Sequence, residues 1–534
     1  MVYDFRPMVL IVLDGYGVST RDPESTRRYS KCPNFEYLEK FFPFATLQAS
    51  GSAVGLPWGE EGNSEVGHLT MGAGRIIYSH LPRIIASIRD GSFFKNPAFQ
   101  KTAEHVKKNN SRLHLCGLFS SGSVHAYAEH LYALLDFAGQ NELKEVYLHL
   151  FTDGRDSPLD EAAGFFTDLE SLLSQKYPFA RIASVIGRSF AMDRDGHWDL
   201  IEKAYRLLTE GEGAPFQSPA AYIEKHYSQN VFDEFVGPGF RFQAGQAVGR
   251  IEENDAVIFF SYREDSAREL AAAFMLEKFG HFQRKKISNL FFATMTAYSP
   301  DFPAEVAYPA IDIAMPLAKI ISNAGLRQLH IAETEKYAHV TYFFNGGKEN
   351  PFPGEDRFLV PSLPTAHFDE HPEMSAAQIT EKVLTMMDNY DFILVNFANA
   401  DMVGHTGSFE ATVKALEVLD FSVGQIIPKV LEKGGAAIIT ADHGNAEEKL
   451  YRQTGEIRSK HTTNPVLFFI AADKFKFQTE KSEKEIAENY QKTIGMLTDV
   501  APTALDLLGL PIPKEMTGVS LLPKLIPDIL KAKS

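Results

Sequence analysis

Short apolar runs alternate with helix-like segments towards both ends of the chain, and three of these runs end close to an aspartate. A continuous apolar run is typical of a strand buried in a parallel sheet, and segments such as 411–431 have the periodicity of helices. This alternation predicts a mostly parallel α/β sheet, whose ligands bind beyond the carboxyl ends of the strands. The runs are 8–13 before Asp14, 392–397 before Asp401, 436–440 before Asp442 and 466–470 after His461.

The middle of the chain repeats the same alternation, which predicts a second α/β domain inserted into the first. The proline-containing segments 78–82 and 308–316 are the expected linkers. We therefore expect a discontinuous domain of residues 1–78 and 315–534 and an inserted domain of residues 82–308. The strands predicted in the inserted domain are 113–118, 145–151, 181–186 and 256–260.

The composition is that of a globular enzyme with more than one core. The chain has 534 residues, of which 44% are hydrophobic and 23% charged, and this length favours two domains. A net charge of −16 argues against non-specific binding to nucleic acid or to an anionic membrane. Cys32 and Cys116 form no C-x-x-C pair, so neither a disulfide framework nor a thiolate metal site is indicated. The sequence shows no signal peptide and no membrane-spanning run, which predicts a cytoplasmic protein.

Aspartate and histidine recur near the predicted strand ends in spacings that suit a metal ion. Asp401 and His405 are four residues apart, which on a helix places both side chains on one face. Asp442 and His443 are adjacent after one strand, and His461 precedes another. Each of these could alone be a helix cap, a turn residue or a surface histidine, but their shared position favours a metal site. Mixed carboxylate and imidazole ligands suit Mn²⁺, Zn²⁺, Co²⁺ or Mg²⁺.

Asp14 and Ser64 add a carboxylate and a hydroxyl from the other end of the chain. Ser64 lies in GNSEVGH, where glycines permit a tight turn, although a serine in this setting could also be a helix N-cap. If folding brings the two ends together, the ligands suffice for two metal ions. One ion would lower the pKa of the serine hydroxyl and the other would neutralise charge on phosphoryl oxygens. The pattern therefore indicates phosphoryl chemistry with Ser64 as the nucleophile.

The predicted inserted domain carries a polar cluster after each of its strands. Arginine binds carboxylate and phosphate groups through paired hydrogen bonds, so arginines converging on one crevice would bind a small molecule with two anionic groups. The alternative is a solvated charged surface. Asp156, next to Arg155, is a candidate general base for a substrate hydroxyl. The clusters contain His125, Arg155 with Asp156, Arg188 with Arg194, and Arg263 with Arg268.

Together these motifs resemble the cofactor-independent (2,3-bisphosphoglycerate-independent) phosphoglycerate mutases of the alkaline phosphatase superfamily. The resemblance covers almost the whole chain. It implies an α/β fold in which a second α/β domain is inserted into an alkaline-phosphatase-like metal domain through two linkers. The matching stretches are LIVLDGYG, EGNSEVGHLTMGAGR, DGRDSP, GRSFAMDRDGHWD, AETEKYAHVTYFFNGG, VNFANADMVGHTG, TADHGNAE, KHTTNPV and DVAPTALDLLGLPIPKEMTGVSL.

The resemblance also implies a role for each candidate residue. Catalysis would involve Ser64, Asp156 and Lys336. The cofactors would be two Mn²⁺ ions, or Mg²⁺ or Co²⁺ in some members, without 2,3-bisphosphoglycerate. One ion would be held by Asp401, His405 and His461, and the other by Asp14, Ser64, Asp442 and His443. The substrate would be held by His125, Arg155, Asp156, Arg188, Arg194, Arg263 and Lys336.

The activity that the resemblance implies is the interconversion of 3-phosphoglycerate and 2-phosphoglycerate, a step of glycolysis and gluconeogenesis, through a phosphoserine on Ser64. The family also implies a monomer, and two linked domains could close over the substrate. Two alternatives are a phosphatase or phosphopentomutase-like enzyme of the same superfamily, and a metal-stabilised binding protein without turnover.

One departure from the family pattern falls in the predicted substrate pocket. The family commonly has F-R-P-D-R-A-R after this strand, whereas this chain has YREDSAR from Tyr262 to Arg268. Ser266 therefore stands where a substrate-binding arginine is expected. Arg268, two residues further on, is a candidate to compensate by binding substrate. The departure bears on substrate affinity more than on the class of reaction.

Overall fold

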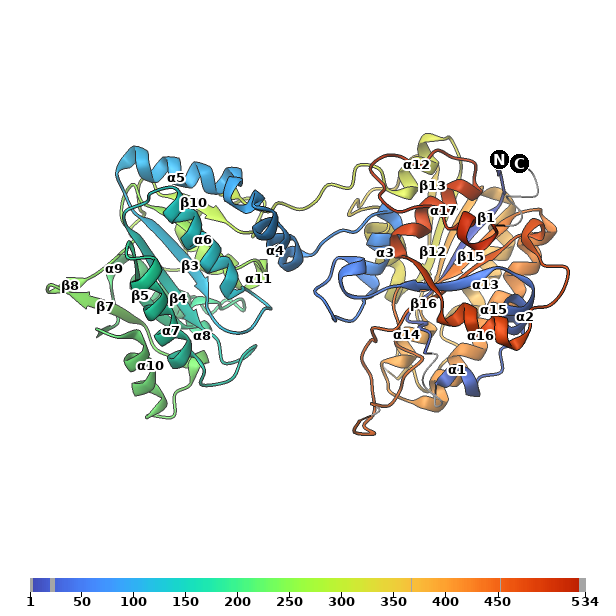
Figure 1. Cartoon of the computed structure of the whole chain (residues 1–534), viewed down its shortest axis with the longest axis horizontal. Coiled ribbons are helices and arrows are strands. Elements are labelled where there is room, and N and C mark those ends of the chain that lie inside the picture. Colours follow the sequence, from blue (N-terminus) through green and yellow to red (C-terminus); the bar gives the residue numbers. More distant parts are fainter. Residues whose placement is uncertain (1–2, 20–24, 366, 452, 528–534) are drawn as a thin grey trace. The chain divides into compact units, whose positions relative to one another are not determined.

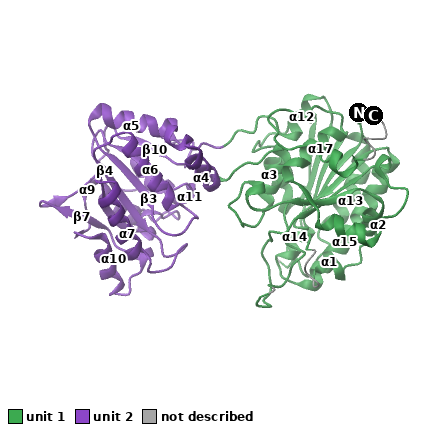
Figure 2. Cartoon of the chain, in the orientation of Figure 1, with its two compact units in different colours: residues 1–79, 311–534 green, residues 80–310 purple. Residues whose placement is uncertain are grey.

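The computed structural model describes residues 3–19, 25–365, 367–451 and 453–527. The chain forms two compact units, shown in different colours in Figure 2. Unit 1 comprises Met1–Ser79 and Ile311–Ser534, and unit 2 comprises His80–Ala310. Each unit has its own sheet and its own hydrophobic core. The fold is therefore α/β with one α/β unit inserted into another.

Within its described residues, unit 1 is built on an eight-stranded sheet of order β13-β12-β14-β1-β15-β16-β2-β17 (Figure 1). β1 is parallel to its neighbours β14 and β15, whereas β16 is antiparallel to β15 and to β2. The prediction of a mostly parallel sheet is thus confirmed. The strands are β1 Met8–Leu13, β2 Phe44–Gln48, β12 Gln328–Glu333, β13 Glu355–Val360, β14 Phe392–Phe397, β15 Ala436–Thr440, β16 Val466–Ala471 and β17 Thr493–Met496.

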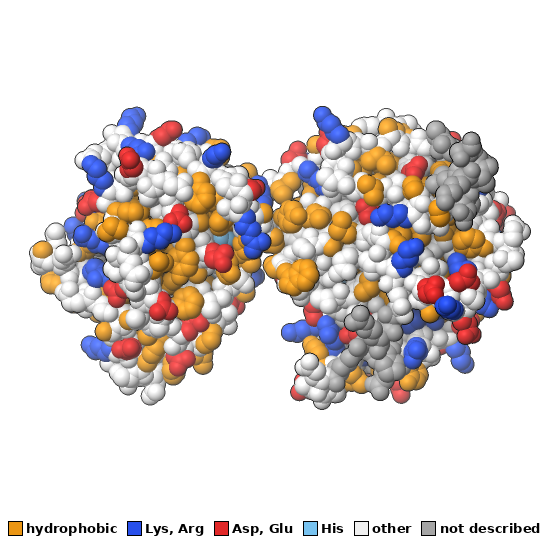
Figure 3. Space-filling model, viewed as in Figure 1, with side chains coloured by type: hydrophobic (Ala, Val, Ile, Leu, Met, Phe, Trp, Pro, Cys, Tyr) orange, Lys and Arg blue, Asp and Glu red, His pale blue; other side chains and the backbone are white. Residues whose placement is uncertain are grey.

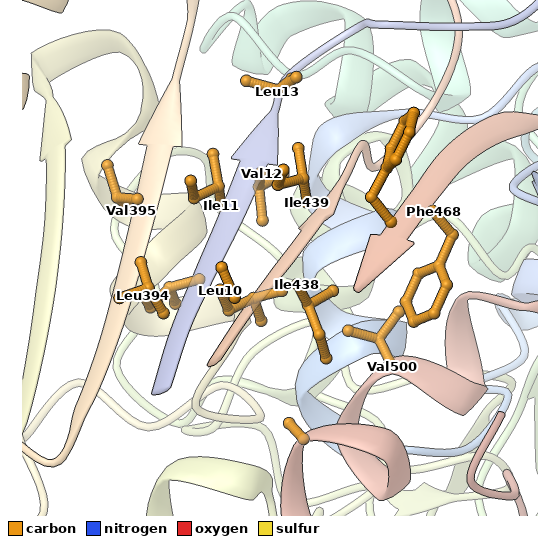
Figure 4. Close-up of a cluster of buried hydrophobic side chains, with 14 of the residues drawn as sticks. Leu10, Ile11, Val12, Leu13, Leu394, Val395, Ile438, Ile439, Phe468 and Val500 are labelled. Atoms are coloured by element: carbon orange, nitrogen blue, oxygen red, sulfur yellow. The ribbon is translucent and has the colours of Figure 1, made fainter. Parts of the chain in front are cut away.

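The central strand β1 is apolar throughout because all six of its residues are buried. Leu10 pairs in register with Leu394 on β14 and Ile438 on β15, and all three side chains are fully buried. Figure 4 shows these side chains next to one another, with Val500 of the helix Val500–Leu507 beside Ile438. This packing fixes the register in which the ends of the three strands meet.

The helices of unit 1 connect the strands and begin with local signals. Asn63 caps the helix that starts at Ser64 by accepting a hydrogen bond from the Val66 backbone nitrogen at 2.9 Å. Ser64 is thus the first helical residue, and the cap is its neighbour Asn63. The helices are α1 Thr26–Tyr29, α2 Pro33–Phe41, α3 Ser64–Ala73, α12 Leu317–Asn323, α13 Ala376–Met386, α14 Asn399–Gly404, α15 Phe409–Glu432, α16 Glu483–Gln491, α17 Val500–Leu507 and α18 Leu522–Leu525.

Unit 2 has a nine-stranded sheet in its described residues, of order β11-β10-β9-β3-β4-β5-β7-β6, with β8 paired to β7. The strands are β3 Leu113–Leu118, β4 Val146–Thr152, β5 Ala180–Gly187, β6 Ala214–Phe216, β7 Gly239–Gln243, β8 Gln246–Ala247, β9 Ala256–Phe259, β10 Phe291–Thr294 and β11 Glu305–Val306. The helices are α4 His80–Asp90, α5 Pro97–Asn109, α6 Ala128–Gln140, α7 Ala162–Lys176, α8 Arg188–Ala191, α9 Trp198–Glu210, α10 Pro219–Tyr227 and α11 Glu264–Met275.

The strands that the sequence predicted are present, with ends that differ by at most one residue. β12 and β13 were not predicted from the sequence, because polar residues interrupt their apolar character. His330 on β12 is fully buried, but its ring nitrogens bond to the Val340 carbonyl at 2.7 Å and to Gln328 at 3.1 Å. Buried polar groups can be accommodated in a strand when they are hydrogen-bonded in this way.

The surface of each unit mixes charges of both signs. On the face drawn in Figure 3, basic side chains lie among acidic and apolar ones in both units. Among the described residues, no helix has the length and apolar character needed to cross a membrane.

The central position of β1 makes its side chains important for stability. We expect Leu10→Ala to lower the free energy of unfolding of unit 1 by about 2–5 kcal/mol, because it leaves a cavity in a close-packed core. Leu359→Ala on β13 is the matched control, since Leu359 is 44% exposed and should cost within about 0.5 kcal/mol. Urea denaturation compares the two variants. An equal loss in both would contradict this account of the core.

Candidate active site

Three aspartates of unit 1 converge near the carboxyl ends of adjacent strands. Asp14 directly follows β1, and Asp401 lies in α14 just after β14. Asp442 lies two residues after the end of β15. All three are 2% exposed or less. Gly15 permits this close approach, because it has a φ of +75° and a Cβ there would lie 2.7 Å from the Asp401 Cα. The order of the strands therefore brings the ligands from both ends of the chain together.

Ser64 and Lys336 lie in the middle of this cluster. The Ser64 hydroxyl is 3.0 Å from Asp14 Oδ1 and 2.9 Å from His443 Nε2. Lys336 Nζ donates to Ser64 Oγ at 2.8 Å and to carboxylate oxygens of Asp14 and Asp401, each at 2.6 Å. The hydroxyl is thus surrounded by a carboxylate, an imidazole and an ammonium group.

One candidate metal group consists of Asp401, His405 and His461. Their ligand atoms lie within 4.8 Å of one another. Asp401 Oδ1 is 3.3 Å from His405 Nε2 and 3.2 Å from His461 Nε2. The Nδ1 atoms of these histidines contact the carbonyls of Ser459 at 2.8 Å and Gly62 at 2.7 Å. Protonated Nδ1 atoms would satisfy these carbonyls, and both Nε2 lone pairs would then face the carboxylate, as in a metal site.

The second candidate group surrounds Asp14 and Asp442. Asp442 Oδ2 accepts no hydrogen bond from the described residues, although His68 Nδ1 lies 3.2 Å and His443 Nε2 3.6 Å away. Ligand atoms of Asp14, His68 and Asp442 lie within 4.8 Å of one another, as do those of Asp14, Asp401 and His443. A buried carboxylate oxygen without a donor needs a positive partner. The residues present therefore fit divalent cations.

The opposite charges in this cluster shift one another's pKa values towards the ionised forms. Burial alone would raise the pKa values of Asp14 and Asp401. The ammonium group of Lys336 and nearby histidines outweigh this effect, so both pKa values fall well below the usual range. Burial lowers the pKa of Lys336, but the negative charges of Asp14 and Asp401 raise it by more, so the net shift is upward. Ionised carboxylates are the form that binds a metal cation.

In unit 2, the side chain of Arg188 is the centre of the polar cluster. Its Nη1 donates to Asp153 and to Asp156, each at 2.6 Å, and its Nη2 lies 2.9 Å from His125 Nε2. A guanidinium group has five N–H donors and no acceptor, so its Nε–H and one Nη2–H remain for a ligand. Arg188 is 7% exposed, and its contacts fix the direction of the remaining donors before any ligand binds.

Three of the other four candidate arginines of unit 2 are also paired with carboxylates. Arg155 pairs with Glu234, whereas Arg194 and Arg263 contact Asp265 at 2.5 and 3.3 Å. Arg268 differs, because its Nε donates to the Tyr298 carbonyl at 2.8 Å. A cavity of about 270 Å³ lies among these groups. Its lining includes His125, Arg155, Arg188, Arg194 and Ser266, but neither Arg263 nor Arg268.

Named relatives cover almost the whole chain. It is 44% identical over 520 residues to the 2,3-bisphosphoglycerate-independent phosphoglycerate mutase of Moorella thermoacetica, with 97% of this chain and 99% of that one covered. It is 46% identical over 534 residues to 2,3-bisphosphoglycerate-independent phosphoglycerate mutase 2 of Methanosarcina barkeri, covering 97% and 99%. The chain belongs to this family.

Two further comparisons agree with membership of the 2,3-bisphosphoglycerate-independent phosphoglycerate mutase family. Residues 84–300, in unit 2, match the profile described as BPG-independent PGAM N-terminus (iPGM_N). A crystal structure of Leishmania mexicana phosphoglycerate mutase at low cobalt concentration is 28% identical, with a TM-score of 0.58 and coverage of 97% of this chain and 99% of that one. That likeness extends over both units.

Three residues near the carboxylates of this family member were not assigned from the sequence. His68 Nδ1 contacts the Ser64 carbonyl at 2.9 Å, and Asn396 Nδ2 bridges His68 and Asp14 at 3.0 and 2.8 Å. Asn445 Nδ2 donates to Asp401 Oδ1 at 2.8 Å. A polar Asn396 inside an otherwise apolar strand was the available sequence signal. These contacts orient the carboxylates and helix α3, which begins at Ser64.

We expect Asp401→Asn to weaken Mn²⁺ binding by more than about 10-fold, because it removes an anionic oxygen shared by the candidate metal groups. Equilibrium dialysis with Mn²⁺ measures the affinity. Asp420→Asn is the matched control, since Asp420 is also 2% exposed but bonds to Asn34 and to the Phe35 backbone. Equal Mn²⁺ affinity in Asp401→Asn and the wild type would contradict the metal assignment.

Proposed function

We propose that the chain interconverts 3-phosphoglycerate and 2-phosphoglycerate through a transient phosphoserine on Ser64. The observation that carries this proposal is the position of the Ser64 hydroxyl, 2.8 Å from Lys336 Nζ and 3.0 Å from Asp14 Oδ1, in a chain of this family. The hydroxyl lies in the first turn of α3, where free backbone N–H groups favour an approaching phosphoryl group.

Two divalent cations would complete this site. We assign one to Asp401, His405 and His461, and the other to Asp14, Ser64, Asp442 and His443, with His68 supporting the second group. Bound there, the cations supply positive charge for the attacking hydroxyl and the phosphoryl oxygens. Manganese is the proposed metal, with magnesium or cobalt as substitutes, and 2,3-bisphosphoglycerate is not required.

The residues of unit 1 would transfer the phosphoryl group. Ser64 Oγ attacks the substrate phosphorus and gives up its proton. The bond from phosphorus to the glycerate oxygen breaks, and that oxygen takes a proton from the ammonium group of Lys336 as it leaves. The proton given up by Ser64, whose Oγ lies 2.8 Å from Lys336 Nζ, restores the ammonium group. Lys336 Nζ lies within hydrogen-bond distance of the nucleophile and would stabilise the transferring phosphoryl oxygens.

The residues of unit 2 would retain glycerate between the two transfers. Arg155, Arg188 and Arg194 line the cavity and offer donors for a carboxylate. Asp156, held by Arg188, would remove the proton from the second hydroxyl, which then accepts the phosphoryl group from Ser64. Arg263 is a further candidate ligand, whereas the contact of Arg268 with Tyr298 favours a structural role over substrate binding.

The cavity lined by Arg155, Arg188 and Arg194 supports a mutase over a phosphatase of the same superfamily, because a hydrolase need not retain its leaving group. Retention requires oriented donors, and unit 2 supplies them. The monomeric state and the cytoplasmic location stay predictions from the sequence.

Removal of metal should abolish the interconversion of 3-phosphoglycerate and 2-phosphoglycerate. We expect added Mn²⁺ to restore it in the chelator-treated protein, because the carboxylates and histidines need a cation partner. Addition of 2,3-bisphosphoglycerate without metal should restore nothing. An enolase-coupled assay measures the rate. Dependence on the bisphosphate, or release of phosphate without mutase turnover, would contradict the proposal.

Ser64→Ala should lower the mutase rate by at least about 10⁴-fold, because the nucleophile is lost. Mass spectrometry after incubation with substrate should find phosphoserine at Ser64 in the wild type. Ser482→Ala is the control, because Ser482 caps α16 in unit 1 and should affect stability only. Substantial mutase turnover in Ser64→Ala would rule out the phosphoserine mechanism.

A further inference from the structure

The serine at the expected arginine position has a specific partner in unit 2. Ser266 Oγ lies 2.7 Å from His125 Nδ1, and the two residues are 2% and 4% exposed. Ser266 belongs to the first turn of α11, whereas His125 lies in the connection between β3 and α6. Both side chains line the same cavity. The contact therefore joins two polar clusters that follow different strands.

A backbone hydrogen bond also joins His125 to the connection between β9 and α11, which leads to Ser266. The Tyr262 backbone nitrogen donates to the His125 carbonyl at 2.8 Å, and the strands that lead into the two segments, β9 and β3, are parallel neighbours. Two side-chain contacts then fix the rotation of the ring: Ser266 at Nδ1 and Arg188 at Nε2. Without Ser266, the described residues would hold the ring on its Nε2 side alone.

The partners of the ring determine its tautomer. Arg188 Nη2 lies 2.9 Å from His125 Nε2, and a guanidinium group can only donate, so Nε2 is the acceptor. Asp156 Oδ2 is 3.4 Å from Nε2, which is beyond the usual range of about 2.7–3.2 Å for an N–H···O bond. The proton is therefore on Nδ1, and Ser266 Oγ accepts it.

Charge favours the same assignment. Burial, followed by the positive charge of Arg188, lowers the pKa of His125 to about 4, so the ring is neutral at pH 7. A neutral ring that accepts at Nε2 needs an acceptor at Nδ1. A serine hydroxyl can fill that role and an arginine cannot. Because Ser266 Oγ accepts a hydrogen bond from Nδ1–H, its own O–H points away from His125 and can donate a hydrogen bond within the cavity.

We propose that Ser266 both positions His125 and binds phosphoglycerate. Its hydroxyl stabilises His125 as the neutral Nδ1–H tautomer and donates a hydrogen bond to an anionic oxygen of the substrate. Such oxygens occur in both the carboxylate and the phosphate group of phosphoglycerate. The proposal rests on the proposed mutase function. It gives the serine a role in the pocket instead of leaving a lost arginine contact.

Ser266→Ala tests the proposal in the full-length, Mn²⁺-loaded enzyme. We expect KM for 3-phosphoglycerate to rise about 10-fold with kcat within about 2-fold, because ground-state binding is what the pair supports. Ser266→Thr retains a hydroxyl and should restore KM to within about 3-fold of the wild type. An unchanged KM in Ser266→Ala, or an equal rise in both variants, would overturn the proposal.

The same unit offers a matched control. Ser184 Oγ lies 2.7 Å from His149 Nδ1, and the two are 2% and 1% exposed, but neither lines the cavity. Ser184→Ala thus removes the same kind of buried bond and should lower the melting temperature about as much as Ser266→Ala. Its KM should stay at the wild-type value. A similar rise in KM in both alanine variants would show that the effect is structural and would overturn the proposal.

A direct spectroscopic measurement needs no variant to remain folded. In protein labelled with ¹⁵N-histidine, with the signal assigned through His125→Gln, we expect a pyrrole-type shift at Nδ1 and a pyridine-type shift at Nε2 of His125. The reverse pattern would overturn the tautomer assignment. An absence of mutase turnover in the wild type would instead contradict the proposed function, and the spectrum would still test the hydrogen bond.

Discussion

The architecture of unit 1 depends on the burial of three carboxylates at one edge of its sheet. Asp14, Asp401 and Asp442 are each 2% exposed or less. Like charges gathered in an interior of low dielectric are strongly unfavourable unless cations lie close by. Lys336 supplies one positive charge through contacts of 2.6 Å with Asp14 and with Asp401. The unbonded Asp442 Oδ2 shows where further positive charge is needed, so metal binding and the stability of this edge are coupled.

The parallel sheet explains how residues so distant in sequence form one centre. Asp14 and Asp442 follow neighbouring parallel strands, and register pairs such as Leu10 with Ile438 set where both strands end. Ser64 and Lys336 lie on either side of the inserted unit in sequence, yet their side chains are 2.8 Å apart. The helices α3 and α12, which border the insertion, are in contact. The insertion therefore leaves the core of unit 1 and the contact between Ser64 and Lys336 intact.

How far the sequence predicts this site depends on whether the signal is local. An apolar run followed by Asp14 or Asp442 is a local pattern, and it indicates both the strand and the position of the carboxylate. The strand β12 lacked such a signal, because its buried His330 is tolerated only through hydrogen bonds to partners that tertiary structure supplies. In the sequence, Ser266 likewise indicated only a missing substrate-binding arginine, because its contact with His125 joins residues 141 positions apart.

Both units bury charged side chains next to groups of the opposite charge, although the sign of the buried charge differs. Unit 1 buries carboxylates and surrounds them with cationic and metal-binding groups, whereas unit 2 buries Arg188 and holds it with Asp153 and Asp156. These countercharges reduce the net attraction for an anionic ligand, but they fix the direction of the remaining N–H groups before the ligand arrives. A pocket that binds a small anion and must then release a similar product benefits from orientation more than from tight binding. A neutral His125 fits this arrangement, because it accepts from Arg188 without adding a further positive charge.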